Sequence, residues 1–128
     1  MDKNKIVITN NKLVYEKYTD KLEFDFSEDY TYRMILEKVR TKIHEGYELL
    51  THPLSGSVKP NETPYKSIIM SKVKGKLDYQ GLNIIEESIM TFDKFNDNKP
   101  TPDWTERVLD DFRVIDDSLI GNVITKML

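Results

Sequence analysis

The feature that most constrains this chain is a proline-rich stretch at residues 51–67, which separates two apolar runs. It holds three of the chain's five prolines, one glycine and several hydroxyl and amide side chains. Proline fixes φ and removes a backbone donor, so the stretch is predicted to be stiff without being helix or strand. Ordered loops of this length inside a compact domain are usually functional. We therefore expect the loop at 51–67 to carry a site.

Apolar patterning on both sides of this loop predicts strands that alternate with helices. We expect strands at residues 5–8, 22–26, 47–51 and 66–73, and helices at 12–18, 28–45, 78–95 and 103–128. The run Ile6-Val7-Ile8 lacks polar alternation, which is typical of a strand covered by helices on both faces. Ser27 is the expected N-cap of the second helix, and Gly46 is its expected end.

Strands alternating with helices indicate a single α/β domain that spans residues 1–128. The predicted fold is a three-layer sandwich in which helices cover a mostly parallel sheet of about four strands. It is Rossmann-like but lacks the Gly-x-Gly-x-x-Gly fingerprint, so we predict no dinucleotide and no other cofactor. The pattern leaves open the direction of the strand at 66–73.

The last segment, residues 103–128, carries apolar residues at spacings of three and four, as an amphipathic helix does. They are Trp104, Val108, Phe112, Ile115, Leu119, Val123 and Met127. Gly121 marks a point at which the segment could divide into two helices. Because this stripe exceeds what a small sheet can cover, we also expect a homodimer formed through it.

Composition excludes several classes of protein. The 128 residues include no cysteine, which excludes thiol catalysis, disulfides and thiolate metal sites. The net charge of −3 argues against nucleic-acid binding. No apolar run approaches the ~18 residues of a membrane span and no signal pattern is present, so we expect a cytoplasmic chain. The two histidines, His44 and His52, have no third ligand at a suitable spacing, so no metal site is predicted.

Charge is unevenly distributed along the chain. Residues 52–76 hold five lysines and one glutamate, whereas residues 103–128 hold six acidic and three basic residues. The basic side, which includes the loop, could attract an anion or could protect a strand edge from aggregation.

Polar residues follow three of the predicted strands, at the edge where parallel sheets bind ligands. We therefore predict that a small anionic ligand binds there. The predicted contacts are Thr9, Asn10, Asn11, Thr51, His52, Ser55, Gly56, Ser57, Lys59 and Asn61.

Each of these groups has a second interpretation. Residues 9–11 could offer amides to a ligand or simply cap the following helix. His52 could be a general base or an anion contact, or it could support the loop. Residues 55–59 have the hydroxyls, glycine and ammonium of an anion cradle but do not form a P-loop. His44, near a helix C-terminus, is given a structural role. No catalytic residue is predicted, and whether the chain is an enzyme stays open.

Four segments of the chain together resemble the GrdX family. They are residues 8–11, 43–46, 51–67 and 111–116. The likeness extends over nearly the whole chain, and the long loop is its most specific part. Members of the family are small proteins encoded beside the glycine, sarcosine and betaine reductases of amino-acid-fermenting anaerobes. The resemblance implies this metabolic setting and does not imply a mechanism.

Two classes of function fit these observations. In the first, the protein binds a small anionic metabolite at the 51–67 loop, as a sensor, a carrier or a weak enzyme. In the second, it is an assembly or maturation factor that docks on a reductase component through the loop or the C-terminal stripe. Nothing in the sequence supplies a redox group, so we do not expect the chain to be a reductase itself.

Overall fold

A computed structural model describes residues 2–55 and 58–128 of the chain. Its strands are β1 (Asp2–Thr9), β2 (Leu22–Phe26), β3 (Glu48–Leu49) and β4 (Ser67–Ser71). Its helices are α1 (Lys12–Tyr18), α2 (Tyr32–His44), α3 (Tyr79–Asn98) and α4 (Glu106–Met127). Each predicted strand and helix is therefore found, although β3 is much shorter than predicted. Gly56 and Ser57, two of the predicted ligand contacts, lie outside the described residues.

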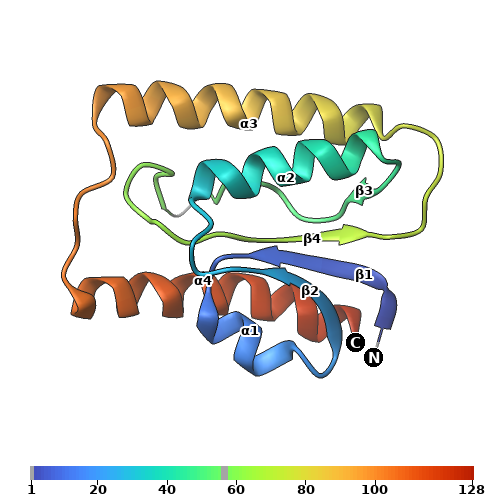
Figure 1. Cartoon of the computed structure of the whole chain (residues 1–128), viewed down its shortest axis with the longest axis horizontal. Coiled ribbons are helices and arrows are strands. Elements are labelled where there is room, and N and C mark those ends of the chain that lie inside the picture. The colour runs from blue at the N-terminus through green and yellow to red at the C-terminus, as the bar shows by residue number, and fades with distance from the viewer. Residues whose placement is uncertain (1, 56–57) are drawn as a thin grey trace.

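The sheet lies between two layers of helices (Figure 1). On one face, Ile6 and Ile8 of β1 and Ile68 of β4 pack in a cluster with α2 and α3. On the other face, Val7 and Ile69 pack with residues of α1 and α4. Successive residues of a strand point to opposite faces, so these runs are apolar throughout because helices cover both faces.

The sheet order is β2-β1-β4-β3; β1 and β2 are parallel, and the other two pairs are antiparallel. The prediction of a mostly parallel sheet is therefore wrong, and the Rossmann-like description that depends on it is not supported. The reason lies in residues 50–66, which connect β3 to β4 and whose described part contains no helix. A parallel neighbour needs a long crossover, usually a helix, whereas a chain that turns back directly forms an antiparallel pair. The mixed sheet brings the end of β1 beside the start of β4, with Thr9 opposite Ser67.

The ends of two helices differ in how well the sequence predicts them. Gly46 follows α2 with φ of 99°, in the left-handed region that favours glycine, as predicted. The start of α2 is wrong by four residues, because its N-cap is Thr31. Ser27 accepts a hydrogen bond from a backbone N–H in the turn that precedes the helix. α4 continues through Gly121 without a break, so the possible division into two helices is not found.

α4 buries only part of the apolar stripe that the sequence predicts. Ile120 and Ile124 are buried against the sheet, whereas Ile115 and Leu119 of the predicted stripe are each 41% exposed. Asp116 is buried together with the isoleucines. An amphipathic helix usually keeps its acidic residues on the solvent face, and Asp116 departs from this rule. The rotation of α4 carries a carboxylate into the interior.

Candidate functional site

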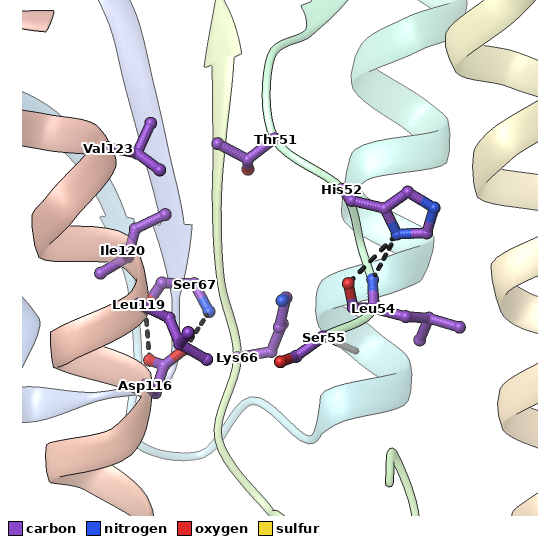
Figure 2. Close-up of a pocket in the computed structure, with 10 residues that line it drawn as sticks. All are labelled: Thr51, His52, Leu54, Ser55, Lys66, Ser67, Asp116, Leu119, Ile120 and Val123. Atoms are coloured by element: carbon purple, nitrogen blue, oxygen red, sulfur yellow. Dashed lines mark hydrogen bonds between the residues drawn. The ribbon is translucent and has the colours of Figure 1, made fainter. Parts of the chain in front are cut away.

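A cavity opens where the chain leaves β3 and moves away from β4 (Figure 2). β3 contains two residues, and pairing continues through one further hydrogen bond, from Leu50 N–H to the Ile69 carbonyl at 3.0 Å. The Thr51 hydroxyl oxygen then accepts a hydrogen bond from Ile69 N–H at 2.9 Å, in place of a backbone carbonyl. Beyond Thr51, a space of about 180 Å³ separates the loop, the start of β4 and α4.

Three segments form the walls of this cavity, which we call the β4–α4 cavity. The loop contributes Thr51, His52, Leu54 and Ser55, β4 and the residue before it contribute Lys66 and Ser67, and α4 contributes Asp116, Leu119, Ile120 and Val123. The walls therefore combine apolar side chains of α4 with polar groups of the loop and the strand. The cavity lies at the edge of the sheet where β1 ends and β4 begins.

Lys66 is the residue that distinguishes this cavity. It is 8% exposed, and Figure 2 shows its side chain pointing into the space between β4 and the loop. Within residues 2–55 and 58–128, its ammonium has no hydrogen bond and no ion pair. Burial lowers the pKa of Lys66, and the nearby charge of Asp116 opposes this shift. Titratable groups whose pKa is shifted by burial and by a neighbouring charge gather at functional sites.

Asp116 faces the same cavity from α4 and is 6% exposed. Its Oδ1 accepts a hydrogen bond from Ser67 N–H at 3.1 Å, and its Oδ2 accepts from the Ser67 hydroxyl at 2.7 Å and from Asn11 Nδ2 at 3.0 Å. Burial raises the pKa of Asp116, while the hydrogen bonds from Asn11 and Ser67 and the charge of Lys66 oppose the rise. These three donors fix the position of the carboxylate beside the cavity.

A chain of hydroxyl groups links Asp116 to the end of β1. Because the Ser67 hydroxyl donates to Asp116 Oδ2, its oxygen is left to accept from the Thr9 hydroxyl, at 2.7 Å. The Thr9 oxygen accepts from Asn11 N–H at 2.9 Å. Each bond polarises the next, which makes such a chain more rigid than its separate members. Thr9 and Ser67 thereby hold Asp116 in one orientation.

Asn10 and Asn11, both predicted ligand contacts, are buried and bonded to the protein. Asn10 Nδ2 donates to the Tyr30 and Pro64 carbonyls at 2.9 and 2.8 Å, and its Oδ1 accepts from Lys66 N–H at 3.0 Å. Asn11 caps α1 by accepting a hydrogen bond from a backbone N–H of that helix. The Asn11 contact corresponds to the capping interpretation of residues 9–11. Asn10 does not cap a helix and instead fixes the backbone of Lys66.

The loop is held in place by side chains from outside it and within it. The Tyr32 hydroxyl donates to the Pro53 carbonyl at 3.1 Å, and burial raises the pKa of Tyr32, which keeps this hydroxyl protonated. His52 is exposed, and its Nδ1 accepts from Leu54 N–H at 3.0 Å. This contact corresponds to the loop-supporting interpretation of His52, although the ring also lines the cavity.

The remaining predicted contacts are distributed around the loop. Thr51, His52 and Ser55 come together in the cavity wall, whereas Lys59 is exposed and does not line it. Asn61 is buried, and its Nδ2 donates to the Lys99 carbonyl at 2.9 Å. The contact of these residues with a ligand stays a prediction.

The sequence does not predict Lys66, Ser67 and Asp116 as site residues. Two weak signals point to them. Lys66 and Ser67 directly precede a fully apolar strand, and the adjacent acids Asp116 and Asp117 lie between the apolar residues of the last helix. Neither signal has a spacing that marks a known type of site.

The described residues also bear on metal binding and on membrane insertion. No group of three histidine, aspartate or glutamate side chains in 2–55 and 58–128 is arranged to hold a metal ion. In the same part of the chain, no helix is long and apolar enough to cross a membrane.

Comparison with known proteins identifies the family. No curated protein and no solved structure matches the chain significantly. The family described as GrdX-like protein matches residues 6–125 of the 128, a range that includes every residue of the β4–α4 cavity. The chain therefore belongs to the GrdX-like protein family.

Proposed function

We propose that this protein is an accessory component of a glycine, sarcosine or betaine reductase system, and that it binds a small anionic metabolite in the β4–α4 cavity. Membership of the GrdX-like family supports the metabolic setting. The cavity supports the binding role, because it lies beside the 51–67 loop and contains an unpaired positive charge.

The observation that carries the binding role is the Lys66 ammonium. It is buried, it points into the cavity, and in the described residues nothing accepts a hydrogen bond from it. The Asp116 carboxylate is near enough to affect the pKa of Lys66, but the two groups form no ion pair. An anion in the cavity would accept hydrogen bonds from the ammonium, each worth about 1.5–3 kcal/mol because a charged group takes part.

The size and walls of the cavity restrict the ligand. A volume of about 180 Å³ lies below the roughly 300–1,000 Å³ of pockets for drug-sized ligands, so a nucleotide does not fit within it. Leu54, Ile120 and Val123 supply apolar contacts, and Thr51 and Ser55 supply hydroxyls. A short aliphatic carboxylate or a small acyl phosphate matches this combination.

A second function, docking on a reductase component as an assembly factor, is favoured by a different observation. Val114, Ile115 and Leu119 of α4 are 56%, 41% and 41% exposed, and Leu119 also borders the cavity. Exposed apolar residues on one helix are a feature of protein-binding surfaces. In that case the cavity would lie at the edge of the docking surface.

A thermal-shift panel tests the binding role. The wild-type protein is heated with phosphate, acetyl phosphate, glycine, sarcosine and betaine, each in turn. A ligand at 100 times its dissociation constant stabilises the native protein by about 2.7 kcal/mol, which raises the melting temperature by several degrees. We expect at least one of the anionic compounds to do so.

Two lysine variants show whether the cavity is responsible. Lys66→Met removes the buried ammonium, and Lys59→Met removes an exposed ammonium of the same loop region. The ligand should stabilise Lys59→Met as it does the wild type and should leave Lys66→Met unchanged. A panel without any shift, together with co-purification of a reductase subunit, would favour the docking function. Loss of the shift in Lys59→Met alone would move the site to the outer part of the loop.

A further inference from the structure

We propose that Lys66 forms a covalent imine with the carbonyl group of a small aldehyde or 2-oxo acid that enters the β4–α4 cavity. This inference rests on the proposed function, since it uses the same cavity, and it adds a reaction to the binding role. The structure supports it through the placement of the amine, the charge balance of the reaction, and the fit of a small carbonyl compound to the cavity.

The first support is the availability of the amine. Other lysines with a perturbed environment are engaged by acids: Lys17 donates to Asp117 at 2.8 Å, and Lys38 lies 3.4 Å from Asp25. The hydrogen bond to Asp117 raises the pKa of Lys17, and at Lys38 a hydrogen bond with Tyr30 and the charge of Asp25 outweigh burial and raise the pKa. Lys66 has no such contact among the described residues, and burial shifts its pKa in the opposite direction. Its nitrogen is therefore the one among these whose lone pair is most accessible for attack on a carbonyl.

The second support is that the reaction preserves the charge that the cavity contains. The lysine ammonium and a carbonyl compound give a protonated imine and one molecule of water. A carbon–nitrogen bond forms and the carbon–oxygen double bond breaks. One proton leaves the nitrogen before the attack and a second leaves after it, and both end on the oxygen that departs as water. The cation at this position is therefore present before and after the reaction.

Asp116 borders the same cavity, where the donors from Asn11 and Ser67 hold its carboxyl group. Its charge acts to raise the pKa of Lys66, against the effect of burial. The ionised form of Asp116 therefore favours the iminium product, as it favours the ammonium. Asp116 is thus a positioning and charge-balancing group, and the bond is formed by Lys66.

The third support is the fit of the substrate class. The cavity of about 180 Å³ is bordered by the exposed residues His52 and Leu119, which gives a small molecule a route from solvent. Apolar residues of α4, Ile120 and Val123, face the side on which the carbon chain would lie. The hydroxyls of Thr51 and Ser55 line the same space, where they can orient the carboxylate of a 2-oxo acid. A compound with two to four carbons fits this description.

Reductive trapping tests the inference on the wild-type protein. The full chain is incubated with pyruvate or with glyoxylate, treated with sodium borohydride, and digested for peptide mapping by mass spectrometry. Borohydride reduces an imine to a stable secondary amine, so the modified lysine carries the ligand permanently. Because burial lowers the pKa of Lys66, a larger fraction of its amine is neutral, and we expect Lys66 to be labelled more heavily than the exposed Lys59.

The controls separate this inference from the proposed function. Acetate has no reactive carbonyl and should give no label, although it can still shift the melting temperature. Lys66→Arg keeps the positive charge without an amine that forms imines, so it should lose the label at this position, while Lys59→Arg should keep it. Because mapping uses the wild-type chain, the result does not depend on whether the variants fold. Stabilisation by pyruvate without a label on Lys66 would overturn the imine and leave anion binding standing. Equal labelling of Lys59 and Lys66 would also overturn it.

Discussion

Gly46 offers a quantitative test of how the chain passes from α2 to β3. Its φ of 99° lies in the left-handed region, where a residue with a Cβ loses about 1–2 kcal/mol. The added Cβ would also lie 3.2 Å from the Gly75 carbonyl oxygen, which is closer than ordinary van der Waals contact. Alanine restricts the unfolded chain and thereby returns about 0.4–1 kcal/mol. Taken together, Gly46→Ala should lower the free energy of unfolding relative to wild type by up to about 1.6 kcal/mol.

Gly75→Ala is a matched control for this prediction. A Cβ at Gly75 meets nothing within 4 Å, although the residue contacts Gly46 through the hydrogen bond from its N–H to the Gly46 carbonyl at 3.2 Å. Both variants change the unfolded chain in the same way, so their difference measures the strain in the native state alone. With a urea m-value of about 2 kcal/mol/M, the midpoint of Gly46→Ala should lie about 0.5–1 M below that of Gly75→Ala. Equal midpoints would show that the helix end does not depend on the left-handed conformation.

Four further substitutions test the β4–α4 cavity and α4. Lys66→Met should raise the free energy of unfolding by about 1 kcal/mol near pH 7, because it removes a buried charge. Burial lowers the folded-state pKa of Lys66 below its ordinary value of 10.5. The stability gain of Lys66→Met should therefore be complete below the folded-state pKa and shrink as pH rises through it. Urea titrations at several pH values would measure this dependence. Asp116→Ala should lower the free energy of unfolding by about 1–3 kcal/mol, because the donors of Asn11 and Ser67 lose their buried acceptor. Asp117→Ala should lower the free energy of unfolding by less than about 1 kcal/mol, because the ion pair between Asp117 and Lys17 is partly solvated. Similar urea midpoints for Asp116→Ala and Asp117→Ala would contradict these two predictions. Val114→Asp should dissociate the expected homodimer in sedimentation experiments, and a wild-type monomer at high concentration would remove the dimer from consideration.

The fold could be predicted from the sequence wherever a local pattern determines the local structure. The apolar run from Ile6 to Ile8 specifies a strand buried on both faces, and Gly46 specifies a helix end, because both depend on neighbouring residues alone. The direction of β4 depends instead on the path of residues 50–66, whose prolines exclude a helix without fixing where the chain returns. The antiparallel pairing on both sides of β4 therefore depends on tertiary structure and not on local sequence. The alternation of strands with helices predicts a parallel sheet correctly only for β1 and β2.

The candidate site is harder to predict from the sequence than the fold, because no local sequence pattern marks its central residues. Lysine and aspartate are most often exposed, so a sequence pattern assigns Lys66 and Asp116 to the solvent. What buries Asp116 is the rotation of α4 that sends Ile120 and Ile124 into the core, and this rotation depends on contacts with α1 and β4 that no periodicity encodes. What opens the space beside Lys66 is the early end of β3. The predicted residues then act in support: Asn10 bonds the Lys66 backbone, and Asn11 bonds the Asp116 carboxylate. A motif rich in amides and hydroxyls can thus indicate the location of a site correctly while the charges that give the site its chemistry come from elsewhere in the chain.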